Sequence, residues 1–164
     1  YADRPRETWE RLGRELVLAT EPVDAAAIVQ RAGGEPWTGM PAGTTIGHVH
    51  LHVGNLEQAQ AFYGDGIGFD KMTWSYPGAL FLGAGGYHHH LGTNLWAGPL
   101  AQPASEDEAK LLEWTIEVPA AADVRQIADS VQRGGFVVVA ADGAAIAKDP
   151  WGTQVKLTLK KEAV

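Results

Sequence analysis

The sequence predicts an α+β fold in which two tandem βαβββ modules form a cupped, mixed eight-stranded sheet. Two stretches, about 45–98 and 110–160, each divide in the same order into an alternating strand, a helix and three further strands, although few residues are identical between them. The 164 residues suffice for one domain with a single core, and 45% hydrophobic with 20% charged residues is ordinary for a globular protein. We therefore expect residues 1–44 to form an N-terminal extension and linker with a short helix, and residues 45–164 to form the compact domain.

The extension contains two short elements. The apolar stretch Leu16–Ala19 is expected to form a strand. Residues 23–32 are expected to form a helix with Asp24 as its N-cap and Gly33-Gly34 at its end. The Pro- and Gly-rich residues that follow are typical of a linker, so the domain is expected to begin near Thr45.

The first module begins with the alternating stretch Ile46–Val53, which predicts a strand. Asn55 is a suitable N-cap for a helix that ends at Gly64. Apolar residues recur along this helix at helical spacing: Leu56, Ala59, Phe62 and Tyr63. The three further strands are expected at Phe69–Trp74, Ala79–Leu82 and Tyr87–Trp96.

The second module repeats this order. Its first strand is expected at Leu111–Val118, and a helix at Asp123–Gln132 ends before Gly134-Gly135. The remaining strands are expected at Phe136–Ala140, Ala144–Lys148 and Gln154–Leu159.

The six histidines all lie on two strands of the first module, within GHVHLHV and YHHHLG. Because side chains alternate across a strand, apolar residues Val49, Leu51 and Val53 face the core and leave His48, His50 and His52 on the opposite face. The same alternation in Tyr87–Trp96 groups His88 and His90 with Asn94, and His89 with Leu91 and Leu95. If both modules curve around one cavity, up to five histidines could face it together with Glu113 and Glu117.

A cavity lined by histidine and glutamate side chains is suited to binding a divalent metal. Imidazole and carboxylate ligands are appropriate for Fe(II), Mn(II), Zn(II), Ni(II) or Co(II). Two histidines and one carboxylate on one side of an octahedral metal leave positions open for a chelating substrate and O₂. Two alternatives remain open: a solvated polar sheet face, and neutral imidazoles that hydrogen-bond one another.

Composition excludes several other classes. Thirteen basic against twenty acidic residues give a net charge of −7, which disfavours a nucleic-acid partner. No apolar run approaches the roughly 20 residues of a membrane span, and no signal peptide is visible, so a cytoplasmic protein is expected. Without cysteine the chain has no disulfide framework, thiolate metal site or cysteine nucleophile.

Several stretches resemble segments of the vicinal oxygen chelate superfamily, which includes glyoxalase I, extradiol dioxygenases, and fosfomycin and bleomycin resistance proteins. The opening strand and helix of a module are similar to IGHVHLHVGNLEQAQAFYGDGIGFD, and the last turn and strand to DPWGTQVKL. The run PGALFLGAGGYHHHLGTNLWAG resembles the C-terminal half of bacterial catechol-2,3-dioxygenase-like proteins. The segment YADRPRETW resembles the residues just after the N-terminal domain of those tandem proteins.

The resemblance implies a divalent metal in the cup of the sheet. His48 matches the first-strand histidine that binds metal across the superfamily, and Glu113 falls where the fifth strand supplies a ligand, normally histidine. Asn94 matches the fourth-strand position, and Lys156 occupies the eighth-strand position where glutamate usually binds. Asparagine is a weak ligand and protonated lysine is none, so a preceding tandem domain or another chain is expected to supply further ligands.

The function implied is that of an extradiol-type dioxygenase, or its C-terminal domain, acting on a small catechol-like substrate and O₂ with Fe(II), or with Mn(II), Zn(II) or Ni(II). Predicted metal ligands are His48, His90 and Glu113. Predicted catalytic residues are His88 or His50 as acid/base, with Tyr87; predicted substrate contacts are Trp74, Tyr76, Trp96 and Asn94. Two other functions remain open: a metal-free module that binds a small molecule or confers resistance, and a glyoxalase-type lyase or isomerase. A homodimer is also expected, because the linker is long and apolar.

Overall fold

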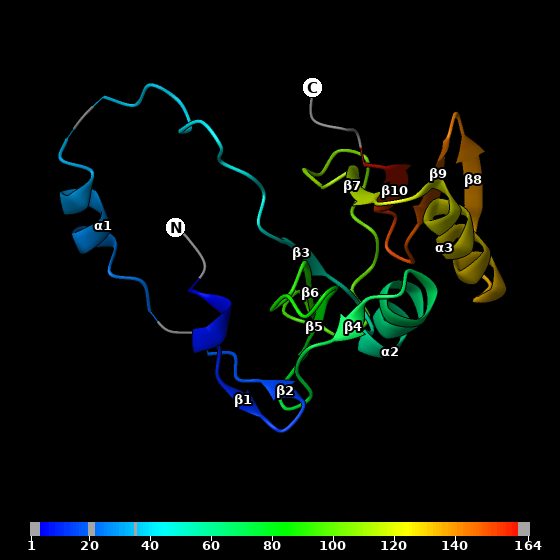
Figure 1. Cartoon of the computed structure of the whole chain (residues 1–164), viewed down its shortest axis with the longest axis horizontal. Coiled ribbons are helices and arrows are strands. Elements are labelled where there is room, and N and C mark those ends of the chain that lie inside the picture. Colours follow the sequence, from blue (N-terminus) through cyan, green and yellow to red (C-terminus); the bar gives the residue numbers. More distant parts are fainter. Residues whose placement is uncertain (1–3, 20–21, 35, 161–164) are drawn as a thin grey trace.

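Both predicted βαβββ modules are present in the computed structural model of the chain, which describes residues 4–19, 22–34 and 36–160. Each module contributes one four-stranded mixed sheet, and the helices lie beside the sheets (Figure 1). The α+β class and the tandem modules are therefore confirmed, with the eight strands divided between two sheets.

The first module forms the sheet with the strand order β3-β6-β5-β4. Its first and last strands are parallel neighbours, and the other pairs are antiparallel. The Asn55 side chain caps the helix by accepting the Gln58 backbone N–H at 2.9 Å, as predicted. The elements are β3 (Val49–His52), α2 (Leu56–Ala59), its π-helical continuation η2 (Gln60–Gly66), β4 (Asp70–Lys71), β5 (Ala79–Gly83) and β6 (Leu91–Asn94).

The second module has the equivalent order, β7-β10-β9-β8, with β7 and β10 parallel. Its helix packs Val124 and Val131 against the sheet face that carries Val155 and Leu157. The opposite face of this sheet is left open. The elements are β7 (Glu113–Val118), α3 (Ala121–Arg133), β8 (Val138–Ala141), β9 (Ala144–Lys148) and β10 (Gln154–Leu159).

The two modules share one hydrophobic core. The rings of Phe62 in η2 and Phe136 before β8 meet edge to face, with centroids 5.0 Å apart. Beside them the buried Tyr63 hydroxyl donates to Asp149 Oδ2 at 2.7 Å, across 86 positions of sequence. The modules are consequently joined by apolar packing and by a buried hydrogen bond.

The N-terminal extension divides into a docked part and an exposed part. A 3₁₀ turn η1 (Arg6–Thr8) leads into a hairpin, β1 (Arg11–Leu12) and β2 (Glu15–Leu16), which packs Leu16 against the first module. The expected strand at Leu16–Ala19 is therefore formed one residue earlier and only in part. The hairpin is held by the backbone hydrogen bond from Leu16 N–H to Met72 carbonyl oxygen at 2.9 Å.

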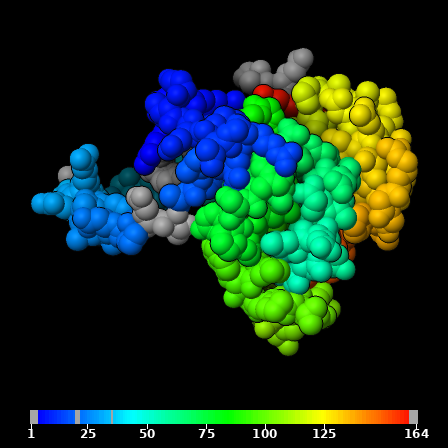
Figure 2. All heavy atoms as spheres, turned by 90° about the horizontal axis from the view of Figure 1, so that it is seen from below, coloured from blue at the N-terminus to red at the C-terminus, as the bar shows by residue number. Residues whose placement is uncertain are grey.

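The exposed part contains the predicted helix, α1 (Ala25–Arg31), whose N-cap Asp24 accepts the Ala27 N–H at 2.9 Å. This helix buries no side chain, and all described residues from 22 to 47 are exposed. In Figures 1 and 2 the helix stands away from the two sheets. Within the described ranges, no helix is both long and apolar enough to cross a membrane.

Candidate metal centre

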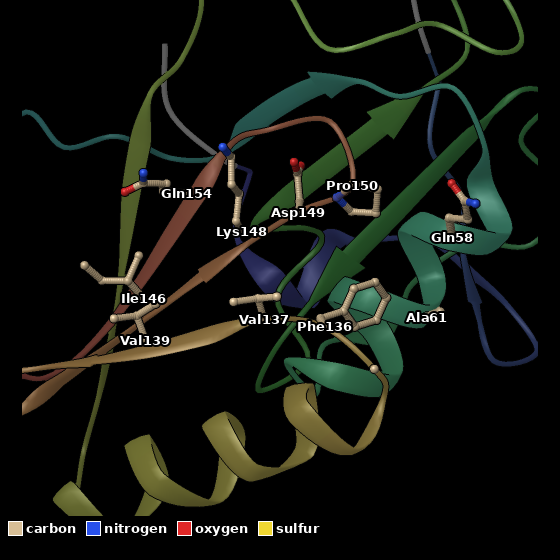
Figure 3. A pocket seen from close by; sticks show the side chains of 11 residues that line it. Gln58, Ala61, Phe136, Val137, Val139, Ile146, Lys148, Asp149, Pro150 and Gln154 are labelled. Carbon is tan, nitrogen blue, oxygen red and sulfur yellow. The ribbon is translucent and has the colours of Figure 1, made fainter.

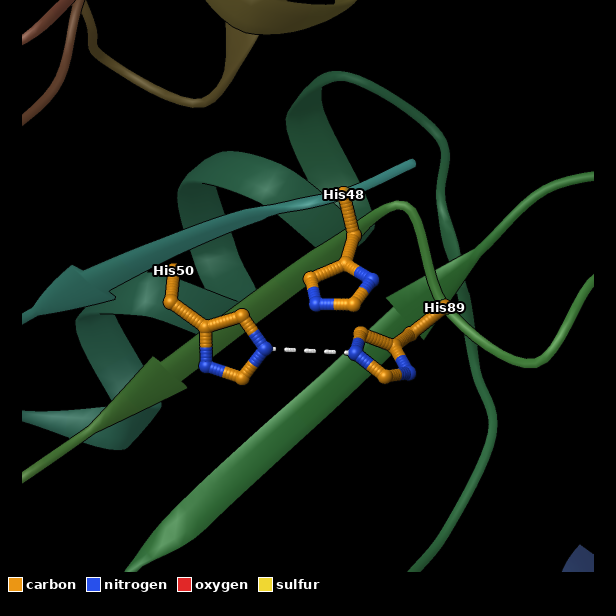
Figure 4. Close-up of side chains that lie close together, drawn as sticks. All are labelled: His48, His50 and His89. Carbon is orange, nitrogen blue, oxygen red and sulfur yellow. Dashed lines mark hydrogen bonds between the residues drawn. The ribbon is translucent and has the colours of Figure 1, made fainter. Parts of the chain in front are cut away.

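Three histidines of the first module converge on its open sheet face (Figure 4). One potential ligand atom from each of His48, His50 and His89 lies within 4.8 Å of the others. The His50 and His89 Nε2 atoms are 3.2 Å apart, and the His48 and His89 ring centroids are 4.5 Å apart. These nitrogens are close enough for one small cation to reach all three after minor side-chain adjustment.

Strand alternation explains two of the three histidines. His48 and His50 lie two positions apart at the start of β3, so their side chains leave the same face, as predicted. Leu51 and Val53 point to the core, also as predicted.

The third histidine reaches the cluster because the strand is shorter than its sequence suggests. Regular pairing in β6 begins only at Leu91, and the preceding turn is closed by the Tyr87 N–H, which donates to the Ala84 carbonyl oxygen at 3.2 Å. His89 therefore lies before the regular strand, where side chains need not alternate between the two faces, and its ring lies beside that of His48. The expectation that His89 shares a core face with Leu91 is wrong for this reason.

The floor of the cluster is formed by a glycine and an aromatic ring. His50 is opposite Gly92 in the β3–β6 register, and a Cβ on Gly92 would lie 2.7 Å from His50 Cε1. Phe81, opposite Gly92 on β5, places its ring centroid 4.9 Å from that of His89 and 5.1 Å from that of Tyr76. The cluster is thus bordered by flat aromatic surface.

His88 supports the cluster from outside. Its Nδ1 atom lies 2.8 Å from His89 Nδ1, so one of these nitrogens donates a hydrogen bond to the other. If His89 is the donor, its Nε2 carries a lone pair directed toward His50 and His48. This is the arrangement in which a metal-binding histidine has its tautomer set by a neighbouring group.

The residues present fit a divalent cation. Burial, and secondarily the charge of His48, lowers the pKa of His50, which favours the neutral imidazole that binds metals. Three imidazole nitrogens are a suitable donor set for Zn(II), Fe(II) or Ni(II). A catalytic site would require the open positions that a three-histidine set leaves.

The other two predicted ligands lie outside this group of converging atoms, and they stay predictions. His90 Nδ1 accepts the Ala84 N–H at 3.2 Å, and its ring stacks on Phe69 with centroids 6.0 Å apart. Burial, followed by the charges of His88 and Arg6, lowers the pKa of His90. Glu113 is exposed on β7, where it lines a cavity of about 1360 Å³ together with His50 and residues of both modules.

Two predicted functional tyrosines lie near the histidines. The Tyr87 ring packs on His88 and His90, with centroid distances of 4.1 and 4.6 Å. Tyr76 packs on Phe81, and Phe81 in turn packs on His89.

The other predicted substrate contacts lie elsewhere on the first module. Trp74 is partly exposed beneath the Arg14 guanidinium, 4.1 Å from its ring centroid. Buried Asn94 accepts the backbone N–H of the exposed Trp96 at 3.1 Å through its Oδ1. Their proposed contact with substrate stays a prediction.

A second cavity, of about 740 Å³, lies between the second module and the first module's helix, which contributes Gln58 and Ala61 to its lining (Figure 3). Its lining is mostly apolar and includes Phe136, Val137, Val139 and Ile146, with Lys148 at its polar side. None of the three converging histidines lines it.

Sequence reasoning missed His89 as a candidate ligand, although a signal was available. Gly85 and Gly86 both have left-handed backbone conformations, with φ of 59° and 71°. A Gly-Gly pair three residues before His89 indicates a turn, and a turn interrupts strand alternation.

Comparisons with known proteins show a relative in sequence and several structures with the same fold. No family model matches the chain. The chain is 42% identical over 154 residues to a protein named catechol-2,3-dioxygenase from Bacillus subtilis (strain 168), covering 92% of this chain. The match covers 53% of that protein, so the chain spans about half the length of this curated relative.

Solved structures show the same fold at low sequence identity. A glyoxalase/dioxygenase from Nostoc punctiforme superposes with a TM-score of 0.59 at 10% identity, covering 78% of this chain and 100% of that one. A glyoxylase/bleomycin resistance protein/dioxygenase domain from Frankia sp. gives 0.57 at 14% identity, with coverages of 72% and 98%. The paired βαβββ modules thus give this chain the fold of these glyoxalase and dioxygenase structures, and its sequence is similar to that of a catechol-2,3-dioxygenase over 92% of its length.

Proposed function

We propose that the chain contributes a divalent-metal site to an extradiol-type dioxygenase that opens the ring of a small catechol-like substrate. The observation that carries this proposal is the convergence of His48, His50 and His89, combined with the similarity to a catechol-2,3-dioxygenase. Fe(II) is the proposed metal and O₂ the proposed co-substrate, because ring opening by a dioxygenase requires both oxygen and a redox-active centre.

His48, His50 and His89 would hold the metal, which when bound supplies a Lewis-acidic, redox-active centre with open coordination positions. The rings of Phe81 and Tyr76 present a flat surface that fits an aromatic substrate. His88 is the proposed acid, because a neutral His88 whose Nδ1 accepts from His89 carries its proton on Nε2, from which it can be donated to the substrate. Tyr87, packed on His88, would keep that ring in place.

Glu113 is the proposed carboxylate of the site. It lines, together with His50, the cavity between the two modules, so a metal near His50 would border the same cavity as Glu113. Two histidines and one carboxylate form the donor set typical of non-haem Fe(II) oxygenases. His90, whose Nδ1 is already hydrogen-bonded to the backbone, is the weaker of the predicted ligands.

Metal content after anaerobic loading with Fe(II) tests the site directly. His89→Ala and His50→Ala should lose most of the bound iron, because each removes one of three donors. His52→Ala is the matched control, since His52 follows His50 on the same exposed face of β3 but lies outside the converging group. Equal iron content in all three variants would refute the proposed site, and oxygen uptake with a panel of catechols would test the reaction.

A metal-free binding module is the second candidate function, favoured by the mostly apolar cavity of about 740 Å³ between the second module and the first module's helix. A flat or amphipathic ligand could lie against Val137, Val139 and Ile146 there. Quenching of tryptophan fluorescence by such a ligand, unchanged by a chelator, would support this function over the first. A glyoxalase-type lyase or isomerase would instead bind metal but consume no oxygen.

We also propose that a second copy, or a further domain of a longer chain, covers the exposed segment of residues 22–47. Large apolar side chains are exposed along it, including Ile28, Trp37 and Ile46. Light scattering after size exclusion would distinguish a dimer, in which two copies cover each other, from a monomer that requires the further domain. A cytoplasmic location stays a prediction.

A further inference from the structure

The N-terminal hairpin, which from here on includes the preceding residues 6–10, lies directly against the loop that carries the histidine run. The ring of Trp9 meets Tyr87 and His88 edge to face, with centroid distances of 5.7 and 5.2 Å. Arg6 donates from Nη1 to the Gly85 carbonyl oxygen at 3.2 Å, and its guanidinium lies 5.6 Å from the Tyr87 ring. The hairpin therefore touches both ends of the turn that places His89.

A single carboxylate anchors this hairpin to the first module. Glu15 Oε1 accepts the Trp74 and Ser75 backbone N–H groups at 2.9 and 2.8 Å, and the Ser75 hydroxyl at 2.5 Å. It also accepts the hydroxyl of Thr73. The hydrogen bonds from Ser75 and Thr73 lower the pKa of Glu15 to about 2, so the carboxylate is ionised at any physiological pH.

The contacts continue from the hairpin to the candidate ligand. Trp9 limits the position of the His88 ring, and His88 Nδ1 lies 2.8 Å from His89 Nδ1. The other ring nitrogen of His89, Nε2, is the one that faces His50. A displacement of His88 would remove the hydrogen bond that determines which His89 nitrogen carries the proton.

We propose that the N-terminal hairpin is a positioning element of the histidine centre: Glu15 anchors it, and Trp9 holds His88, which orients His89. Trp9 and Glu15 are positioning residues, because neither touches the converging ring nitrogens. The inference rests on the proposed function only in taking His89 as a ligand. The docking of the hairpin and the orientation of the two histidine rings do not depend on metal.

The test uses the full chain and two measurements. The ¹⁵N chemical shifts of the histidine rings in metal-free protein report the tautomers of His88 and His89. Titration with Zn(II) reports the affinity of the centre. Trp9→Ala and Glu15→Ala should shift the His89 ring signals toward a mixture of tautomers and lower Zn(II) affinity by about 10–100-fold, as the loss of an outer-shell partner does.

Matched variants separate positioning from general damage. Glu10→Ala removes an exposed carboxylate from the same hairpin and should leave both measurements at their wild-type values. Trp9→Phe keeps an aromatic edge against His88 and should restore most of the affinity lost in Trp9→Ala. Glu15→Gln keeps an acceptor oxygen and should lie between wild type and Glu15→Ala.

The outcomes distinguish this inference from the proposed function. Unchanged ring signals and unchanged affinity in Trp9→Ala and Glu15→Ala would overturn the inference and leave the metal centre intact. A wild-type protein that binds no Zn(II), but whose His89 signals still change in these variants, would refute the metal centre and retain the positioning role. If an alanine variant does not fold, the intermediate effect expected in Glu15→Gln decides, and wild-type ring signals and affinity in that variant count against the hairpin.

Discussion

Gly92 has no side chain at the position where His50 needs space. The β3–β6 register places the two residues opposite each other, and the imidazole lies over the glycine. Any Cβ there would come within 3 Å of three atoms of the His50 ring. The glycine is required by this close approach of a functional side chain.

Gly92→Ala should therefore displace His50 and lower metal affinity while the protein stays folded, since a partly exposed imidazole can rotate away more easily than backbone can move. The control is Gly47→Ala, where a Cβ would meet no atom within 4 Å. Zn(II) titration and thermal unfolding together measure the two effects. Wild-type affinity in Gly92→Ala would show that the ring of His50 is not needed in its present position.

Tyr63 in the first module stabilises the contact between the modules through its hydrogen bond to Asp149 in the second. Burial, followed by the neighbouring Asp149 carboxylate, raises the pKa of Tyr63, so its hydroxyl remains a donor at all ordinary pH values. Burial also raises the pKa of Asp149, while the bond from Tyr63 opposes that rise. The ionised carboxylate is therefore the form that depends on Tyr63.

Tyr63→Phe should lower the free energy of unfolding by about 1–3 kcal/mol at pH 7, because a buried acceptor loses its partner. The loss should be smaller in acid, where Asp149 is protonated, and should grow as the pH rises through the pKa of that group. Urea unfolding at a series of pH values measures this. A loss that does not vary with pH would show that the carboxylate is not the group concerned.

Among the elements, the turn before β6 and the N-terminal hairpin act together. Because of the turn, β6 begins only at Leu91 and His89 lies outside the strand; Trp9 of the N-terminal hairpin packs against this turn. Neither element contributes a residue to the hydrophobic core that the two modules share. Both consequently affect the site much more than the stability of the fold.

The hairpin should separate from the first module in acid. The pKa of Glu15 falls from its usual 4.5 to about 2 on folding, so its contribution is complete above pH 4.5 and is lost as the pH falls toward 2. Fluorine NMR of 5-fluorotryptophan-labelled protein should show Trp9 and Trp74 changing together in that window. Glu15→Gln should abolish this transition; an unchanged transition in that variant would assign it to another group.

At the scale of the whole molecule, the segment of residues 22–47 and the shared core differ in how far their side chains are buried. All described residues between 22 and 47 are exposed, whereas residues of both modules form one continuous core. The stability of the chain should therefore depend on the core alone.

Replacing Ile28, Val29 and Trp37 by serine should change the free energy of unfolding by less than about 0.5 kcal/mol each. The contrasting control is Leu82→Ala, at a fully buried position of β5, which should cost about 2–5 kcal/mol. If the segment pairs with a second copy, the serine variants should also shift light-scattering mass from dimer to monomer. A large loss of stability in the monomeric variants would contradict the exposed placement of the segment.

Local patterns were enough to predict most of the elements. Alternating apolar residues located β3, β7 and β10, and the caps at Asp24 and Asn55 located the starts of two helices, because these signals depend only on neighbours in sequence. The same alternation placed His48 and His50 on one face. It could not place His89, since that required knowing where strand pairing stops.

The sequence by itself determined the α+β class, the two βαβββ modules and the confinement of every histidine to the first of them. Only the tertiary structure decided which histidines meet and that His90 stacks on Phe69. It also decided that Trp9 contacts Tyr87 in the histidine loop, and that Glu15 accepts the hydroxyl of Thr73, 58 positions away. The physical reason is that periodicity specifies the direction of a side chain within one strand. Contacts between distant segments depend on register, turns and core packing, which no local pattern contains.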